Sequence, residues 1–467
     1  MSTLDRRTFL RRAAGAGTAA VLGGGTVLGA PPAAAKPRPG GATPPRRVYV
    51  LVVDGCRPDE VVSGLMPRLA ALRATGTNYP AARSLPVMET IPNHVMMMSG
   101  VRPDRSGVPA NQVYDRAAGE IRDLDRPTDL RFETLLERLR TTGRTTASVL
   151  SKRYLHGIFD GRATHAWDPA PEVPVSGHAP DAATVEALID LVDAHDPDLV
   201  FANLGDVDRF GHSDLTGSTL QAARKVALAD TDTQVGRFLD HLTSTGRYAD
   251  SVLLVLADHS MDWSLPGRIV SLTPVFDADP LLSGRFVLAQ NGGADLAYWT
   301  GPDAERTAAV ARMRALATAT DGVLAAHPPE ALRLGPEAGD LVLYCRAGWR
   351  FTEPQPYDNP IPGNHGHPAT EPIPFFVSGG SPLVRRGATS TGAARPVDIA
   401  PTVGALFGLP APTGGSATTV SPTVMGSASD QDSFRARTNA PGRRCAGSGA
   451  AETTMSTDCD PDPLGMA

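Results

Sequence analysis

The chain has 467 residues, of which 41% are hydrophobic and 20% are charged, and its formal net charge is −6 at neutral pH. This composition predicts a globular protein with a large core and excludes a disordered or fibrous chain. The acidic balance argues against a protein that coats nucleic acid, because such a protein would be basic. Glycine and proline are frequent but follow no fixed period, which excludes a repeat architecture.

The first 35 residues have the pattern of an export signal. Arg6 and Arg7 precede Thr8-Phe9-Leu10, and an uncharged run rich in alanine and glycine extends from Ala13 to Ala35. This pattern resembles a twin-arginine signal with a small-residue cleavage site. A retained membrane anchor is the alternative, since the run is long enough to span a bilayer. We expect residues 1–35 to engage the twin-arginine export machinery and to be removed. The mature protein is then secreted or kept in the cell envelope, without stable membrane association.

A linker at 36–46 precedes a segment in which short apolar runs alternate with amphipathic helical patterns. This alternation predicts an α/β fold, with a doubly wound, mostly parallel sheet sandwiched by helices. Strands are predicted at 48–53, 146–150, 199–203, 251–257 and 374–377, and helices at 66–75, 132–140, 182–194 and 219–242.

Residues 283–351 break this rhythm. They predict a small inserted α+β subdomain, with strands at 285–289, 295–299 and 340–345 and a helix at 304–318. The catalytic domain therefore spans 47–412, and a low-complexity tail occupies 413–467. Within the tail, the short spacing of Cys445 and Cys459 favours a disulfide over free thiols. Cys56 and Cys345 are expected to be buried free thiols.

Acidic and histidine side chains follow several predicted strands. Asp54 follows the first, Asp206, Asp208 and His212 follow the third, and Asp258 and His259 follow the fourth. The carboxyl ends of parallel strands meet at one edge of a sheet, where ligands bind. Oxygen and nitrogen ligands of this kind suit zinc, manganese or iron. His365 and His367 form a further cluster before the last strand.

Thr90 lies close to the start of a predicted helix, because Pro92 suits the first helical turn. A helix N-terminus favours negative charge and so helps to bind phosphate. Contact with a metal would lower the pKa of the threonine hydroxyl and make it a nucleophile. The alternative is that Thr90 is an ordinary helix cap.

Taken together, these residues resemble the alkaline phosphatase superfamily, and most of all its type I phosphodiesterase and nucleotide pyrophosphatase branch. The ordered match extends from residue 47 to about residue 410. Its blocks are Val-Val-Asp54-Gly, Thr90-Ile-Pro-Asn-His, Gly100-Val-Arg-Pro-Asp with Gly107 and Asn111, Asp208-Arg-Phe-Gly-His212, Ala-Asp258-His259, Asn-His365-Gly and Val397-Asp-Ile-Ala-Pro-Thr402.

The resemblance implies two divalent metal ions per chain, usually zinc. Asp208, His212 and His365 would hold one ion, and Asp54, Asp258 and His259, with the oxygen of Thr90, would hold the other. Asp206 and His367 are near-equivalent alternatives to Asp208 and His365. Thr90 would attack phosphorus and form a phospho-threonine intermediate, and Asn111 would bind a non-bridging phosphate oxygen.

Three positions bear on the substrate, which we expect to be a small-molecule phosphate ester. Ile91 stands where nucleotide-cleaving relatives often carry an aromatic residue, and Glu89 stands where a basic residue is common. Ile91 argues against a nucleotide preference, and Glu89 would make the entrance less favourable for a polyanion. Tyr154 is a candidate stacking surface, with a plain packing role as the alternative.

The resemblance thus implies an exported two-metal phosphodiesterase. A phosphomonoesterase or phosphonate hydrolase on the same scaffold is the alternative, although Asn111 favours the diester. A sulfatase is disfavoured, because Cys56-Arg57-Pro58 continues as Asp59-Glu60 and so departs from the sulfatase motif. A scaffold protein without metals would require gaps among the ligand positions, and the matched positions are all filled.

Overall fold

The computed structural model describes residues 47–174, 177–214, 216–354 and 362–420. The expected signal, the linker and the tail beyond residue 420 lie outside these residues, as do Cys445 and Cys459. Cys56 and Cys345 are free thiols and are buried, as expected. None of the described helices is long and apolar enough to cross a membrane.

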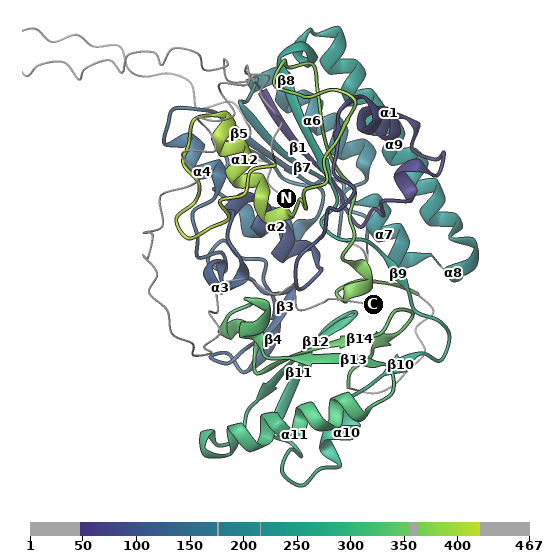
Figure 1. Cartoon of the computed structure of the whole chain (residues 1–467), viewed down its shortest axis with the longest axis vertical. Helices are drawn as coiled ribbons and strands as arrows, with labels where there is room; N and C mark the ends of the chain where they lie inside the picture. The colour runs from purple at the N-terminus through teal and green to yellow at the C-terminus, as the bar shows by residue number, and fades with distance from the viewer. Residues whose placement is uncertain (1–46, 175–176, 215, 355–361, 421–467) are drawn as a thin grey trace, which may run out of the picture. The chain divides into compact units, whose positions relative to one another are not determined.

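A mixed, mostly parallel sheet of eight strands forms the centre of the fold (Figure 1). Its inner strands are continuous apolar runs that are buried on both faces, as parallel strands between two helical layers should be. In spatial order the strands are β18 (Ala388–Thr389), β2 (Thr77–Asn78), β17 (Phe375–Ser378), β8 (Ser251–Leu256), β1 (Arg47–Val53), β7 (Leu199–Leu204), β5 (Thr146–Leu150) and β6 (His165–Trp167).

The pairing around β1 fixes the edge at which the site lies. β1 pairs in parallel with both β7 and β8, so that Val53 lies opposite Leu204 and Val52 opposite Leu256. β5 pairs in parallel with β7, so four strand ends meet at one edge. The last predicted strand differs in direction, because β17 runs antiparallel to β8.

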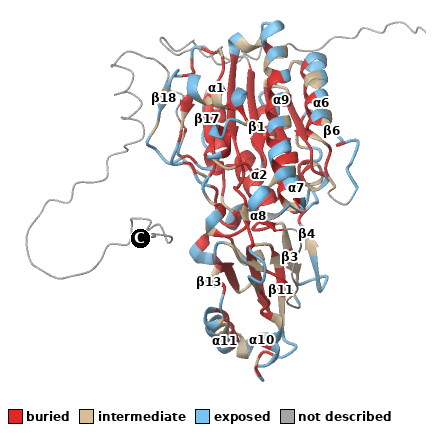
Figure 2. Cartoon of the chain, turned by 90° about the vertical axis from the view of Figure 1, so that its right-hand side faces the viewer, coloured by how far each residue is buried: buried red, intermediate tan, exposed pale blue. Residues whose placement is uncertain are grey.

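Helices cover both faces of this sheet (Figure 1), and Figure 2 shows one of the two layers in front of the strands. One layer contains α1 (Pro67–Thr75), α6 (Asp181–His195) and α9 (Ala222–Ser244), and the other contains α2 (Thr90–Ser99), α4 (Leu135–Arg140), α5 (Arg153–Phe159) and α12 (Ile399–Leu406). The helix predicted at 219–242 is broken in two. Gln221 takes a left-handed conformation with φ 48° and separates α8 (Gly217–Leu220) from α9.

Residues 286–345 form a separate antiparallel sheet in the order β11 (Phe286–Asn291), β12 (Ala294–Trp299), β14 (Leu341–Cys345) and β13 (Val323–His327). α10 (Thr273–Asp277) and α11 (Arg306–Ala319) pack on it, and Phe276, Trp299 and Met313 belong to its own hydrophobic core. β13 was not predicted from the sequence.

Short elements surround the site. A hairpin of β3 (Gln112–Asp115) and β4 (Glu120–Asp123) contacts β11. β9 (Asp262–Trp263) pairs with β16 (Gly363–Asn364), and β10 (Ile269–Val270) pairs with β15 (Arg350–Phe351). The turn between β11 and β12 contacts the site directly, because the N–H of Gly293 donates to the carbonyl of His365 at 2.6 Å.

Candidate metal and phosphoryl-transfer site

Three carboxylates meet at the edge where β1, β7 and β8 end. Asp54 follows β1, Asp258 follows β8, and Asp208 lies in α7 (Asp206–Ser213), which begins just after β7. All three are buried. Gly55 makes this approach possible, because it turns the chain with φ 68° and a Cβ there would lie 3.1 Å from Asp208 Oδ1.

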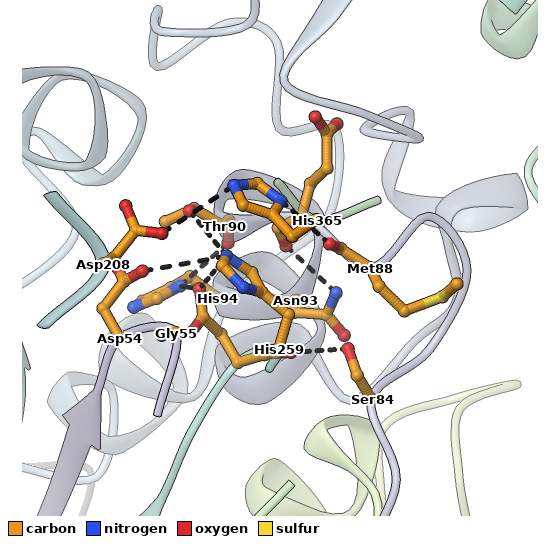
Figure 3. A network of polar contacts seen from close by, with 12 residues as sticks. Asp54, Gly55, Ser84, Met88, Thr90, Asn93, His94, Asp208, His259 and His365 are labelled. Atoms are coloured by element: carbon orange, nitrogen blue, oxygen red, sulfur yellow. Dashed lines mark hydrogen bonds and ion pairs between the residues drawn. The ribbon is translucent and has the colours of Figure 1, made fainter. Parts of the chain in front are cut away.

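Three histidines present their Nε2 atoms to these carboxylates, and Figure 3 shows His259 and His365 among them. His212 Nε2 lies 3.3 Å from Asp208 Oδ1, and His259 Nε2 lies 3.3 Å from Asp258 Oδ2. His365 Nε2 lies 3.8 Å from Asp208 Oδ1, and its ring stacks on that of His259 with centroids 3.8 Å apart.

The other ring nitrogen of each histidine, Nδ1, is hydrogen-bonded to a backbone carbonyl oxygen. The Nδ1–H of His212 donates to Gly363 at 2.9 Å, that of His259 to Ser260 at 2.9 Å, and that of His365 to Met88 at 3.2 Å. Metal-binding histidines are typically oriented in this way, because the bond fixes the tautomer and leaves Nε2 free. Burial, followed by the neighbouring His259 and His212, lowers the pKa of His365 well below its usual value and keeps its imidazole neutral.

The carboxylates also fit a metal centre. Asp208 Oδ1 and Asp258 Oδ2 are buried and accept no hydrogen bond from the described residues, whereas the buried Asp54 Oδ1 has the ammonium of Lys152 2.9 Å away. The other oxygen of each is occupied, as in the bonds from Asn203 Nδ2 to Asp54 Oδ2 at 2.7 Å and from Gly55 N–H to Asp258 Oδ1 at 3.1 Å. Buried unpaired oxygens are costly unless a cation compensates them.

Two groups of possible ligand atoms lie within 4.8 Å of one another. One is formed by Asp54, Asp258 and His259, and the other by Asp208, His259 and His365. His259 therefore belongs to both groups, whereas the family resemblance implied that it binds only one of the two metal ions. His212 is outside the tight groups but faces Asp208 and stacks edge-on to His365, with centroids 5.0 Å apart.

The two alternative ligands have other partners. Asp206 accepts from His178 Nε2 at 2.8 Å and from the Asp181 N–H at 3.1 Å. His367 Nε2 lies 2.9 Å from Asp262 Oδ2. Neither belongs to the two ligand groups.

Thr90 is the first residue of α2, where Glu89 occupies the cap position without a side-chain capping bond. The Thr90 hydroxyl is directed to the ligands instead, since Oγ1 lies 3.2 Å from His259 Nε2 (Figure 3). The hydroxyl therefore does not act as an ordinary helix cap. His94 supports this turn, because its Nδ1–H donates to the Thr90 carbonyl at 2.8 Å.

Lys152 is a site residue that the sequence analysis missed. It follows β5 and is fully buried, with Nζ 2.9 Å from Asp54 Oδ1, 2.7 Å from Asp208 Oδ2 and 3.5 Å from Thr90 Oγ1. Burial alone would lower the pKa of the Lys152 ammonium, but Asp208 and Asp54 outweigh it and raise that pKa above its usual value. Its position after a strand at the ligand edge is the signal that could have identified it.

A cavity of about 410 Å³ opens beside Thr90, Asp208, His212 and His365. Asn111, Ile91 and Tyr154, the expected substrate-binding residues, all line it. Asn111 Oδ1 accepts the Ile91 N–H at 2.8 Å, which leaves the amide nitrogen to donate elsewhere. Glu89 also lines the cavity, and burial raises its pKa to about 8.

Solved structures share this fold at low sequence identity. Murine ectonucleotide pyrophosphatase/phosphodiesterase 5 matches with a TM-score of 0.65 and 18% identity, covering 78% of this chain and 96% of that chain. A phosphonoacetate hydrolase from Sinorhizobium meliloti 1021 matches with a TM-score of 0.61 and 20% identity, with the same coverage.

Curated relatives match over about half of this chain. A venom phosphodiesterase of Macrovipera lebetinus is 25% identical over 234 residues, which are 47% of this chain and 26% of that protein. Ectonucleotide pyrophosphatase/phosphodiesterase family member 3 of Mus musculus is 23% identical over 256 residues, or 51% and 27%. The match spans only about a quarter of the length of these relatives.

A model of the type I phosphodiesterase/nucleotide pyrophosphatase family matches residues 48–368. The chain belongs to this family.

Proposed function

We propose that this protein is an exported phosphodiesterase that cleaves small-molecule phosphate esters or anhydrides through a phospho-threonine intermediate. The observation that carries the proposal is the position of Thr90 Oγ1. This hydroxyl lies at the start of a helix, 3.2 Å from His259 Nε2, among three buried carboxylates and beside an open cavity.

The donor set supports two divalent ions, and we propose zinc because imidazole and carboxylate ligands suit it. Asp208, His212 and His365 would hold one ion, and Asp54, Asp258, His259 and Thr90 the other, with His259 close to both. Two such ions clamp the attacking and leaving oxygens of an in-line displacement.

The described residues would perform the remaining work. In the first step Thr90 Oγ1 releases its proton to solvent and attacks phosphorus. The Thr90 Oγ1–P bond forms, the bond to the leaving-group oxygen breaks, and that oxygen takes up a proton from solvent as the first product leaves. Asn111 Nδ2 donates to a non-bridging oxygen as negative charge develops. In the second step water attacks phosphorus and releases a proton, the Thr90 Oγ1–P bond breaks, Thr90 Oγ1 takes up a proton, and the phosphate product leaves.

A monoesterase or phosphonate hydrolase remains the second candidate, and Lys152 favours it. A monoester carries one more negative charge than a diester, and the Lys152 ammonium lies 3.5 Å from Thr90 Oγ1. Relative turnover of bis-p-nitrophenyl phosphate and p-nitrophenyl phosphate separates the two. A clear preference for the monoester would overturn the diesterase assignment.

The first test combines metal analysis with the Thr90→Ala variant. We expect about two zinc ions per chain in both proteins, and a loss of diesterase activity by at least about 10³-fold in the variant. Thr141→Ala is the matched control, because Thr141 is exposed and belongs neither to the ligand groups nor to the cavity lining. Full activity in Thr90→Ala with metal retained would exclude Thr90 as the nucleophile.

We also propose export by the twin-arginine route, which the Arg6-Arg7 signal supports. Changing both arginines to lysine should leave the protein in the cytoplasm. Unchanged export of that variant would refute this route.

A further inference from the structure

Arg209 is a cation in the substrate cavity that has no ion-pair partner among the described residues. It lies in α7 between Asp208 and His212, and it lines the same cavity as both. Its Nε atom is buried and makes no hydrogen bond. The ligand roles implied by the resemblance fall on Asp208 and His212, and they assign no role to Arg209.

Tyr154 holds the guanidinium in place. Arg209 Nη2 donates to the Tyr154 hydroxyl at 3.3 Å, and Arg209 Cζ lies over the Tyr154 ring, 5.6 Å from its centroid. Lys152 Nζ also lies 5.9 Å from that ring. The Tyr154 ring is therefore already engaged by cations, which fits a supporting role for Tyr154 better than the stacking of a nucleobase.

None of the described residues that line the cavity forms an ion pair with Arg209. Burial alone would lower the pKa of its guanidinium, but Tyr154 and Asp208 lie close enough to outweigh burial and raise that pKa. Glu89 and Asp123 line the cavity, but neither forms an ion pair with Arg209. The side-chain amide of Gln290 is occupied on both sides, by the Phe351 carbonyl at 3.0 Å and the Glu353 N–H at 2.9 Å. Of the described residues that line this cavity, Arg209 is the only arginine or lysine.

We propose that Arg209 binds a second anionic group of the substrate. The substrate class is then a phosphate ester or anhydride that carries a carboxylate or a further phosphate near the scissile phosphorus. An arginine held by a tyrosine presents a planar pair of donors that matches either group. This inference rests on the proposed function, since it assumes that the scissile phosphorus binds beside Thr90.

The test uses three phosphonates that differ only in the second group. Methylphosphonate has none, phosphonoacetate has a carboxylate, and methylenediphosphonate has a second phosphonate. Their dissociation constants are measured by calorimetry on the zinc-loaded wild-type protein and on Arg209→Gln. We expect the preference of the wild-type protein for the two compounds with a second anionic group over methylphosphonate to fall roughly ten- to a hundredfold in the variant.

Arg153→Gln is the matched control. Arg153 is also close to Tyr154 in sequence, but it is exposed and paired with Asp168 and Glu172 outside the cavity. Its removal should leave the preference unchanged. An effect on phosphonoacetate alone assigns a carboxylate, an effect on methylenediphosphonate alone assigns a phosphate, and either outcome supports the subsite.

An unchanged preference in Arg209→Gln would overturn the inference. If Arg209→Gln fails to fold or loses zinc, Arg209→Lys replaces it. This variant keeps the charge but loses the fork of donors, so the preference should still fall, and an unchanged preference again overturns the inference. The calorimetric ratio needs no turnover. Failure of the subsite is therefore distinguishable from failure of the proposed diesterase activity, which Thr90→Ala tests.

Discussion

Lys152 and Asp208 form a buried ion pair at the centre of the site, with Nζ 2.7 Å from Oδ2 and neither side chain more than 2% exposed. The same ammonium lies 2.9 Å from Asp54 Oδ1. Asp54 and Asp208 belong to different groups of possible metal ligands. One lysine thus compensates a carboxylate from each group, which lowers the cost of keeping both charged without metal.

This arrangement predicts that the effect of Lys152→Met depends on metal. In the metal-free protein the variant should lose about 3–5 kcal/mol of unfolding free energy, because two buried carboxylates lose their counter-charge. With zinc bound the loss should be much smaller. Urea unfolding with and without zinc measures the difference, and Lys225→Met on the exposed face of α9 is the control. An equal loss in both states would contradict this role.

The short motifs explain why much of the site was predictable. Asp54, Asp258 and His259 directly follow buried apolar runs, so parallel pairing alone brings them to one edge. The first residue of α2 was predictable from Pro92. These features depend on local sequence and on one general property of parallel sheets.

Other features depend on contacts that a single sequence does not display. The position of Lys152 between Asp54 and Asp208 depends on the packing of β5 next to β7. β17 pairs antiparallel with β8, and its apolar sequence suits either direction. The break at Gln221 requires a left-handed residue that is not glycine, which sequence patterns disfavour.

Gly293 links the inserted subdomain to the metal ligands. A Cβ at this position would lie 2.0 Å from His367 Nδ1 and 2.9 Å from the His365 carbonyl oxygen. Gly293→Ala should therefore displace the His365 segment and weaken zinc binding by at least about tenfold, as measured by competition with a chelator. Gly392→Ala is the control, because a Cβ there meets Ser390 Oγ at 3.5 Å and nothing closer. Unchanged zinc affinity in Gly293→Ala would show that the contact is not needed.

Asp295 makes the stability of the fold depend on pH. It is fully buried in β12, and neither carboxyl oxygen makes a hydrogen bond with the described residues. Burial, followed by the nearby Glu353, raises its pKa well above 3.8. The folded state therefore keeps a proton that the unfolded state releases above about pH 4. The contribution of Asp295 to the free energy of unfolding is thus fully present below that pH and is lost as the pH rises.

Replacing the carboxyl group should remove that dependence. Relative to the wild-type protein, Asp295→Asn should gain about 1.4 kcal/mol of unfolding free energy for each pH unit above pH 4, up to the folded pKa. Urea unfolding between pH 4 and 7 measures this slope, and the exposed Asp321→Asn should show none of it. If the unfolding free energies of Asp295→Asn and the wild-type protein changed equally with pH, Asp295 would be ionised in the folded state.

Asn111 tests the proposed stabilisation of charge on the phosphate. Asn111→Asp keeps the oxygen that accepts the Ile91 N–H at 2.8 Å, but it replaces the donating amide with a carboxylate oxygen. We expect kcat on bis-p-nitrophenyl phosphate to fall by about 10²–10³-fold, because a donor to the developing negative charge is lost and a like charge is introduced. Zinc content should stay constant, since Asn111 is not a proposed ligand. Asn78→Asp is the control, because Asn78 lies in β2 and does not line the cavity. If Asn111→Asp kept more than about a tenth of the wild-type kcat, other groups would stabilise the negative charge on the phosphate oxygens. Lys152 would then be the next residue to test.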